Sequence, residues 1–180
     1  MRKVDPNALD LEERVVKTNK VQKTHKGGRT LSWNALVVVG DGRGHVGAAI
    51  GKARGIPDAI RKGVEAAKKS IIRVELDGTT IPHQVLERWG AAEVMLKPAS
   101  PGTGIVAGGS VRAILEAVGI RDVLAKSLGS ANAINTAWAT IKALEALRSP
   151  LQVAQLRGVE TSQFQLRRRP AEVSENVDQA

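Results

Sequence analysis

The sequence contains no cysteine and no tyrosine, and apart from histidine its aromatic residues are three tryptophans and one phenylalanine. Without cysteine, disulfides, reactive thiolates and zinc sites with cysteine ligands are excluded. Proteins that read single-stranded RNA stack its bases on aromatic side chains. This chain lacks the rings for such a platform. Any contact with nucleic acid is therefore expected to use phosphates, ribose hydroxyls and helix shape.

Long apolar runs are also missing. The longest runs, such as residues 35–39, are far shorter than the roughly 20 residues needed to span a bilayer. The N-terminal residues have no apolar core typical of a signal peptide. We therefore expect a cytoplasmic protein without a membrane partner.

Residues for catalysis are not grouped in the sequence. His25, His45 and His83 are scattered, each near Lys, Arg or Pro, and they do not have the spacing of metal ligands. No pattern of paired carboxylates or of Ser, His and Asp stands out, although a triad can assemble in space from distant positions. We predict no catalytic residues, no metal site and no cofactor.

The positive charge of the chain is distributed unevenly. Residues 1–73 hold 16 Lys and Arg against 7 Asp and Glu, whereas residues 74–180 hold 11 of each, so the first part carries the whole net charge of +9. A basic part beside a neutral part favours a polyanion-binding module joined to a module with another task. The alternative is a general bias that keeps the protein soluble.

Residues 11–74 predict a first domain with the order β-β-β-α. Strands are expected within 14–30, with a turn at Gly27 and Gly28, then over 31–39, where apolar residues alternate as in a half-buried strand, and over 45–52 after a hairpin turn at Asp41 and Gly42. Pro57 is well placed to begin a helix that packs its apolar face on the sheet.

Residues 75–158 predict a second α+β domain, which makes the fold class α+β with two small domains. From residue 74 onward, strands are expected at 74–76, 79–85 and 91–97, and an extended segment at 120–128. Helices are expected over 110–118, after a glycine-rich loop, around 134–144, and over 150–157 behind a Ser149 cap. Residues 1–10 and 159–180 are expected to be loose or disordered.

Five cations recur at every third position from Lys17 to Arg29. Their β-branched neighbours and the two glycines favour an extended arm, from which the charges point in several directions and fit between phosphates. If all five neutralise phosphates, the log–log salt slope of RNA binding is roughly −3.5 to −4.5. The alternative is a solvated charged hairpin. The residues expected to bind RNA are Lys17, Lys20, Lys23, Lys26, Gly27, Gly28, Arg29, Arg43, Lys52, Arg54, Arg61, Lys62, Lys68 and Lys69.

Two glycine motifs allow competing interpretations. Residues 42–47 match GxGxxG, but a dinucleotide site needs a helix that begins directly after this motif. The glycines that follow and Pro57 do not favour a helix there and indicate a hairpin instead. In a hairpin, the glycines of the motif would permit tight turns and close approach of RNA. The loop 101–109 precedes a helix and could hold a phosphate, but it lacks the ending of a P-loop. It could equally pack against RNA or a protein.

Together, the motifs KGGR, VVGDGRGHVG, GKA, PASPGTGIVAGG and LAKSLGSAN, spread over residues 11–158, resemble the small-subunit ribosomal protein five family. The resemblance implies a first domain similar to double-stranded-RNA-binding folds. It implies a second domain that shares its architecture with small-molecule kinases without their activity.

The resemblance also implies a function. It predicts a structural protein of the small ribosomal subunit that binds 16S rRNA, contacts small-subunit proteins four and eight, positions head against body, and contributes to translational accuracy near the mRNA entrance. The arm 20–29 would reach toward the neck of the subunit. The expected interface with protein four comprises Gly102, Thr103, Gly104, Gly108 and Gly109. A small-molecule kinase and a free regulator of double-stranded RNA are the alternatives.

Overall fold

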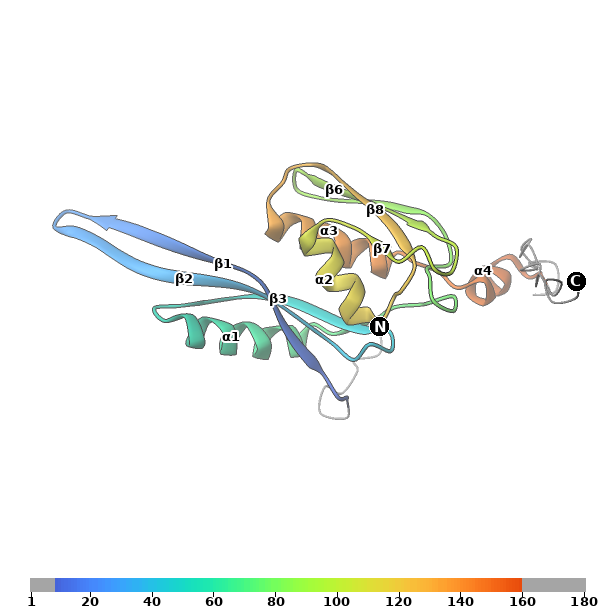
Figure 1. Cartoon of the computed structure of the whole chain (residues 1–180), viewed down its shortest axis with the longest axis horizontal. Helices are drawn as coiled ribbons and strands as arrows, with labels where there is room; N and C mark the ends of the chain where they lie inside the picture. The colour runs from blue at the N-terminus through green and yellow to red at the C-terminus, as the bar shows by residue number, and fades with distance from the viewer. Residues whose placement is uncertain (1–8, 160–180) are drawn as a thin grey trace, which may run out of the picture. The chain divides into compact units, whose positions relative to one another are not determined.

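The computed structural model describes residues 9–159, which contain eight strands and four helices (Figure 1). The strands are β1 (Glu12–His25), β2 (Gly28–Gly40), β3 (His45–Ala53), β4 (Ile72–Arg73), β5 (Val85–Trp89), β6 (Ala92–Pro98), β7 (Ile105–Val106) and β8 (Val123–Gly129). The helices are α1 (Ile56–Lys69), α2 (Gly109–Val118), α3 (Ala133–Glu145) and α4 (Pro150–Arg157). Within the described residues, 9–148 form one compact unit and a second begins at Ser149, so each is described by itself.

The first sheet has the order β1-β2-β3-β4 and all its neighbours are antiparallel. β1 and β2 form one long hairpin that turns at residues 26–27, with a bulge between Val15 and Lys17. The expected order β-β-β-α is confirmed, and the short strand β4 adds one more neighbour to β3. The GxGxxG segment leads into β3 and not into a helix, which confirms the hairpin interpretation.

Helix α1 lies on β2 and β3 through small residues. It begins with Pro57 in its first turn and buries Ala59, Gly63, Val64 and Ala67. A Cβ added to Gly51 of β3 would lie 2.5 Å from the backbone nitrogen of Gly63, so only glycine lets helix and strand approach this closely.

The expectation that β2 is a half-buried strand is wrong for its second half. From Ala35 onward every residue of β2 is buried. Val37 and Val39 pack with α1, whereas Leu36 and Val38 belong to the larger core that includes α2. The sequence is continuously apolar over 35–39, which is typical of a strand covered on both faces.

The second sheet has the order β5-β6-β8-β7, in which β7 alone runs parallel to its neighbour. Helices α2 and α3 supply its core: Val94 and Leu96 of β6 are fully buried together with Ile114 and Leu144. Because α2 also contacts β1, β2 and β3, the two sheets share one core. The architecture is α+β with two small sheets, as expected.

Part of the strand prediction between the two sheets is wrong. Residues 74–84 form a loop that contains a single bridge between Asp77 and Thr80, and β5 begins only at Val85, the last residue of the predicted strand 79–85. Val74 and Ile81 are apolar because they anchor this loop in the core, not because they belong to a strand. In the segment expected to be extended, β8 begins at Val123, and the two-residue strand β7 was not predicted.

Helix α4 matches its prediction residue for residue. The Ser149 side chain accepts a hydrogen bond from the backbone nitrogen of Gln152, and Gly158 ends the helix with φ +63°. The expectations for residues 1–8 and 160–180 lie outside the described residues. Within residues 9–159, no helix is long and apolar enough to cross a membrane.

Candidate nucleic-acid interface

The outer part of the β1–β2 hairpin, residues 20–31, is exposed along its whole length. Strand β3 ends at Ala53 opposite Trp33, so the hairpin continues beyond it as a two-stranded ribbon (Figure 1). Residues 14–40 contain no aspartate or glutamate, so the acidic residues of the hairpin are confined to Glu12 and Glu13 at the start of β1. The exposed cations of this segment are Arg14, which pairs with Glu116 of α2, and Lys17, Lys20, Lys23, Lys26 and Arg29.

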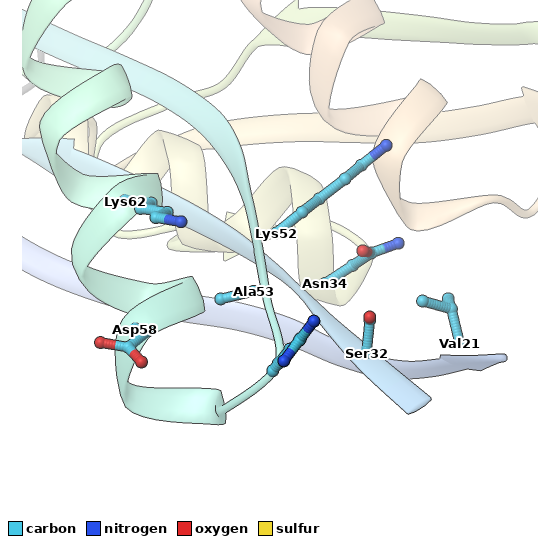
Figure 2. Close-up of a pocket in the computed structure, with 8 residues that line it drawn as sticks. Val21, Ser32, Asn34, Lys52, Ala53, Asp58 and Lys62 are labelled. Carbon is cyan, nitrogen blue, oxygen red and sulfur yellow. The ribbon is translucent and has the colours of Figure 1, made fainter. Parts of the chain in front are cut away.

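A groove of about 790 Å³ lies at the base of this ribbon (Figure 2). Figure 2 shows that four elements contribute to it: Val21 from β1, Ser32 and Asn34 from β2, Lys52 and Ala53 from β3, and Asp58 and Lys62 from α1; Arg54 completes the lining. Three of these residues are cations and one is a carboxylate, so the groove is positive. Its hydroxyl and amide groups can exchange hydrogen bonds with ribose.

Sequence reasoning found the groove cations but missed Ser32 and Asn34. Both stand in a strand segment that was interpreted by its apolar pattern alone. The sequence alone does not group them with the cations, because the strand register of the folded sheet does so: Asn34 pairs with Lys52 of β3, and the amide lies on the same face as a predicted RNA-binding lysine.

The basic residues on α1 differ in whether a carboxylate lies beside their charge. Lys68 donates to the Glu13 carboxylate of β1 at 2.9 Å, and Arg61 lies 3.7 Å from Asp58. Lys62 lines the groove, and Lys69 is exposed at the end of the helix. Lys62 is therefore the α1 cation that the structure brings together with Lys52 and Arg54.

The loop 41–44 has a structural task that the sequence did not reveal. The backbone nitrogens of Gly42 and Gly44 donate to the carbonyls of Ala117 and Val118 at 3.0 and 2.9 Å, at the end of α2. The positive φ values of Gly42 and Gly44, +65° and +100°, shape the turn so that its backbone reaches a helix of the same chain. Only Arg43 of this loop projects as an exposed cation.

Asp41 holds this loop in shape. Burial raises the pKa of its carboxyl, but hydrogen bonds from the backbone nitrogens of Arg43 and His45 and from the His45 ring outweigh that effect and hold the pKa below its ordinary value. The carboxylate therefore stays ionised and keeps Arg43 at the tip of the turn.

The glycine loop before α2 already contains an anion. The backbone nitrogens of Gly102 and Gly104 donate to one Asp122 oxygen at 2.9 and 3.0 Å. The Gly104 amide and the Thr79 hydroxyl, helped by the amides of Gly102 and Thr103, lower the pKa of Asp122 against the opposing effect of burial. The Asp122 carboxylate thus occupies the place that a phosphate would need at these amides.

The rest of that loop is open. Gly108 caps the N-terminus of α2 and Gly109 begins the helix. Both are exposed, as are Gly102 and Thr103, whereas Gly104 is half-buried. Within residues 9–159, no group of three or more acidic or histidine side chains is placed to hold a metal ion.

Both domains match known families. The model for "Ribosomal protein S5, N-terminal domain" matches residues 11–75, and the model for "Ribosomal protein S5, C-terminal domain" matches residues 87–157. The small ribosomal subunit protein uS5 of Chloroflexus aurantiacus is 50% identical over 166 residues, which cover 92% of this chain and 93% of that protein. The chain belongs to the bacterial ribosomal protein S5 family. The expected family resemblance is confirmed.

Membership of the S5 family has two consequences for the hypotheses drawn from the sequence. The family consists of structural ribosomal proteins and not of enzymes, so the small-molecule kinase alternative is wrong. The occupation of the Gly102 and Gly104 amides by Asp122 gives a physical reason why this glycine loop does not bind a nucleotide phosphate there.

Proposed function

We propose that this S5-family chain is a structural constituent of the small ribosomal subunit in the cytoplasm and binds 16S rRNA through its first domain. The observation that carries the proposal is the carboxylate-free segment 14–40 of the hairpin with the basic groove at the base of its ribbon, in a chain matched by both S5 domain models. Phosphates are the partners that an exposed, uncompensated row of cations attracts most strongly. Ser32 and Asn34 add contacts that distinguish ribose from deoxyribose.

The two domains bind different partners. Residues 11–74 hold the RNA, and the nearly neutral residues 75–158 hold protein neighbours, with proteins four and eight as the partners. The exposed loop that contains Gly102, Thr103, Gly104, Gly108 and Gly109 is the surface offered to protein four. The two domains share a core through α2, so a force on the hairpin is transmitted to the protein contacts. Through this linkage the chain positions head against body and contributes to accuracy and to the mRNA entrance.

A salt titration tests the RNA interface. We expect the replacement of four hairpin cations by alanine to reduce the log–log salt slope for a 16S rRNA fragment by about 3 units, because each phosphate contact contributes roughly 0.7 to 0.9. The variant replaces Lys20, Lys23, Lys26 and Arg29.

The matched control loses the same charge elsewhere. It replaces four exposed cations of the second domain, Lys97, Arg121, Lys126 and Arg148, by alanine. We expect its slope to stay close to that of the unaltered chain. Equal slopes for the two variants would show that net charge alone drives binding and would reject the interface. In cells, co-sedimentation with small subunits on a sucrose gradient distinguishes this function from a free regulator of double-stranded RNA, which stays at the top.

A further inference from the structure

The first sheet has one long free edge, the outer side of β1 (Figure 1). Within residues 9–159, this strand of 14 residues pairs with β2 alone, so no strand lies on its other side. The other edge strands of the two sheets are much shorter: β4 and β7 have two residues each, and β5 has five. A long exposed edge is a template on which a strand of another molecule can pair. β1 is therefore the edge that needs protection from such pairing.

Apart from its cations, β1 has the composition of a strand that pairs readily. Valine and threonine recur along it, and both are enriched in strands. Val15 and Val21 are 43% and 37% exposed, so apolar surface adjoins the open edge. A second copy of the chain is the fitting partner, because two β1 strands related by a two-fold axis pair antiparallel and present the same residues to each other.

Three lysines interrupt this strand at a regular spacing. Lys17, Lys20 and Lys23 recur at every third residue, so at most two residues without a positive charge separate neighbouring lysines. A spacing of three on a strand of period two also alternates the faces of the ribbon. Lys17 stands opposite Leu36 and Lys23 opposite Thr30, both even-numbered positions of β2, whereas Lys20 stands opposite an odd-numbered one.

This spacing opposes pairing in every antiparallel register. If two copies paired through β1, a lysine inside the overlap would have a lysine of the other copy either directly opposite or two positions along on the same face. These are the neighbours that interact across a strand pair, and like charges there are destabilising. Arg14 is left out of this argument because it pairs with Glu116 of the same chain.

We propose that the lysines of β1 have a further function besides contact with RNA: they keep the free edge of β1 from pairing with a second copy of this chain. The proposal goes beyond the proposed function, because it concerns the protein before it binds RNA. It gives a reason for cations on both faces of a solvated ribbon, since a strand added at the edge would meet both faces.

Charge removal and charge reversal test this function in the free full-length chain by sedimentation velocity. The neutral variant carries Lys17→Gln, Lys20→Gln and Lys23→Gln, which lowers the net charge by three from +9 to +6. The reversed variant carries glutamate at the same positions, which lowers it by six to +3. We expect the unaltered chain and the reversed variant to sediment as monomers and the neutral variant to sediment as dimers or larger species. If net charge alone kept the copies apart, the reversed variant would associate most.

A matched control removes three exposed cations from α1 in the same domain, through Arg61→Gln, Lys62→Gln and Lys69→Gln. Its net charge equals that of the neutral variant, and we expect it to remain monomeric. Hydrogen exchange locates the contact, because amides of β1 that gain a partner strand exchange more slowly. A monomeric neutral variant would overturn the proposal, as would equal association of the reversed variant or the control, or association without slower exchange in β1. These outcomes leave RNA binding untouched, because the salt titration tests that function separately.

Discussion

The contact between the loop 41–44 and the end of α2 yields the sharpest prediction. Gly119 ends α2 with φ +93°, and a Cβ at this position would lie 2.5 Å from the Gly42 carbonyl carbon and closer still to its oxygen. The change Gly119→Ala therefore adds two penalties. A left-handed conformation costs a residue with a Cβ about 1 to 2 kcal/mol, and forcing a methyl group into a packed contact costs about 1 to 3 kcal/mol.

We expect Gly119→Ala to lower the free energy of unfolding by about 2 to 5 kcal/mol, a large share of the roughly 5 to 15 kcal/mol typical of a domain. Urea unfolding followed by tryptophan fluorescence measures this change. Two further variants separate the conformational penalty from the packing penalty, because each changes a glycine at which only one of these penalties applies.

Gly102 has φ +89° with nothing within 4 Å of an added Cβ, so Gly102→Ala reports the conformational penalty alone. Gly40 has no positive φ, but its Cβ would lie 2.7 Å from the Ala117 carbonyl carbon, so Gly40→Ala reports the packing penalty alone. If Gly119→Ala costs no more than Gly102→Ala, the loop does not rest on the helix and the reasoning is refuted.

Three further predictions concern single features. Because the folded-state pKa of Asp122 is depressed, its ionised form stabilises the fold above about pH 4, and this contribution is lost as the pH falls. The thermal midpoint of the Asp122→Asn variant is therefore expected to fall less steeply between neutral and acid pH than that of the unaltered chain. A decline parallel to that of the unaltered chain would contradict this role. The Lys142 ammonium lies 4.6 Å from the Trp89 ring, so Lys142→Ala is expected to cost about 0.5 to 1 kcal/mol in urea unfolding, and a neutral result would mean that the pair is fully solvated. Replacing Ser32 and Asn34 by alanine is expected to reduce the preference for duplex RNA over duplex DNA of the same sequence in competition binding, with the Lys97→Ala chain as control; an unchanged preference would remove these two residues from ribose recognition.

Much of the candidate interface was predictable because its signals are local. The cations of the arm, the Gly27–Gly28 turn and Pro57 at the helix start act through backbone conformation and charge, which neighbouring residues fix. The short helix α4 was predicted to the residue because its serine cap and terminal glycine are both local devices. The family could be assigned from the sequence because several long motifs together carry more information than the spacing of any single pair of residues.

The errors share a different cause. Val74 and Ile81 satisfied the pattern of a strand, yet a strand forms only where a partner strand lies beside it, and here the chain uses both residues to anchor a loop. Likewise, the sequence gives no sign that α2 covers the second face of β2, because the helix lies about seventy residues further along the chain.

By itself, the sequence determined the charge of the first part, the lack of aromatic platforms, the existence of most helices and strands, and the family. Tertiary structure alone decided which anion occupies the glycine loop, where the loop 41–44 rests, and which face each hairpin cation occupies. The physical reason is that a hydrogen-bond partner or a strand register joins residues that are distant in the chain. Such pairings are chosen by the packing of the whole core and not by any neighbouring residue.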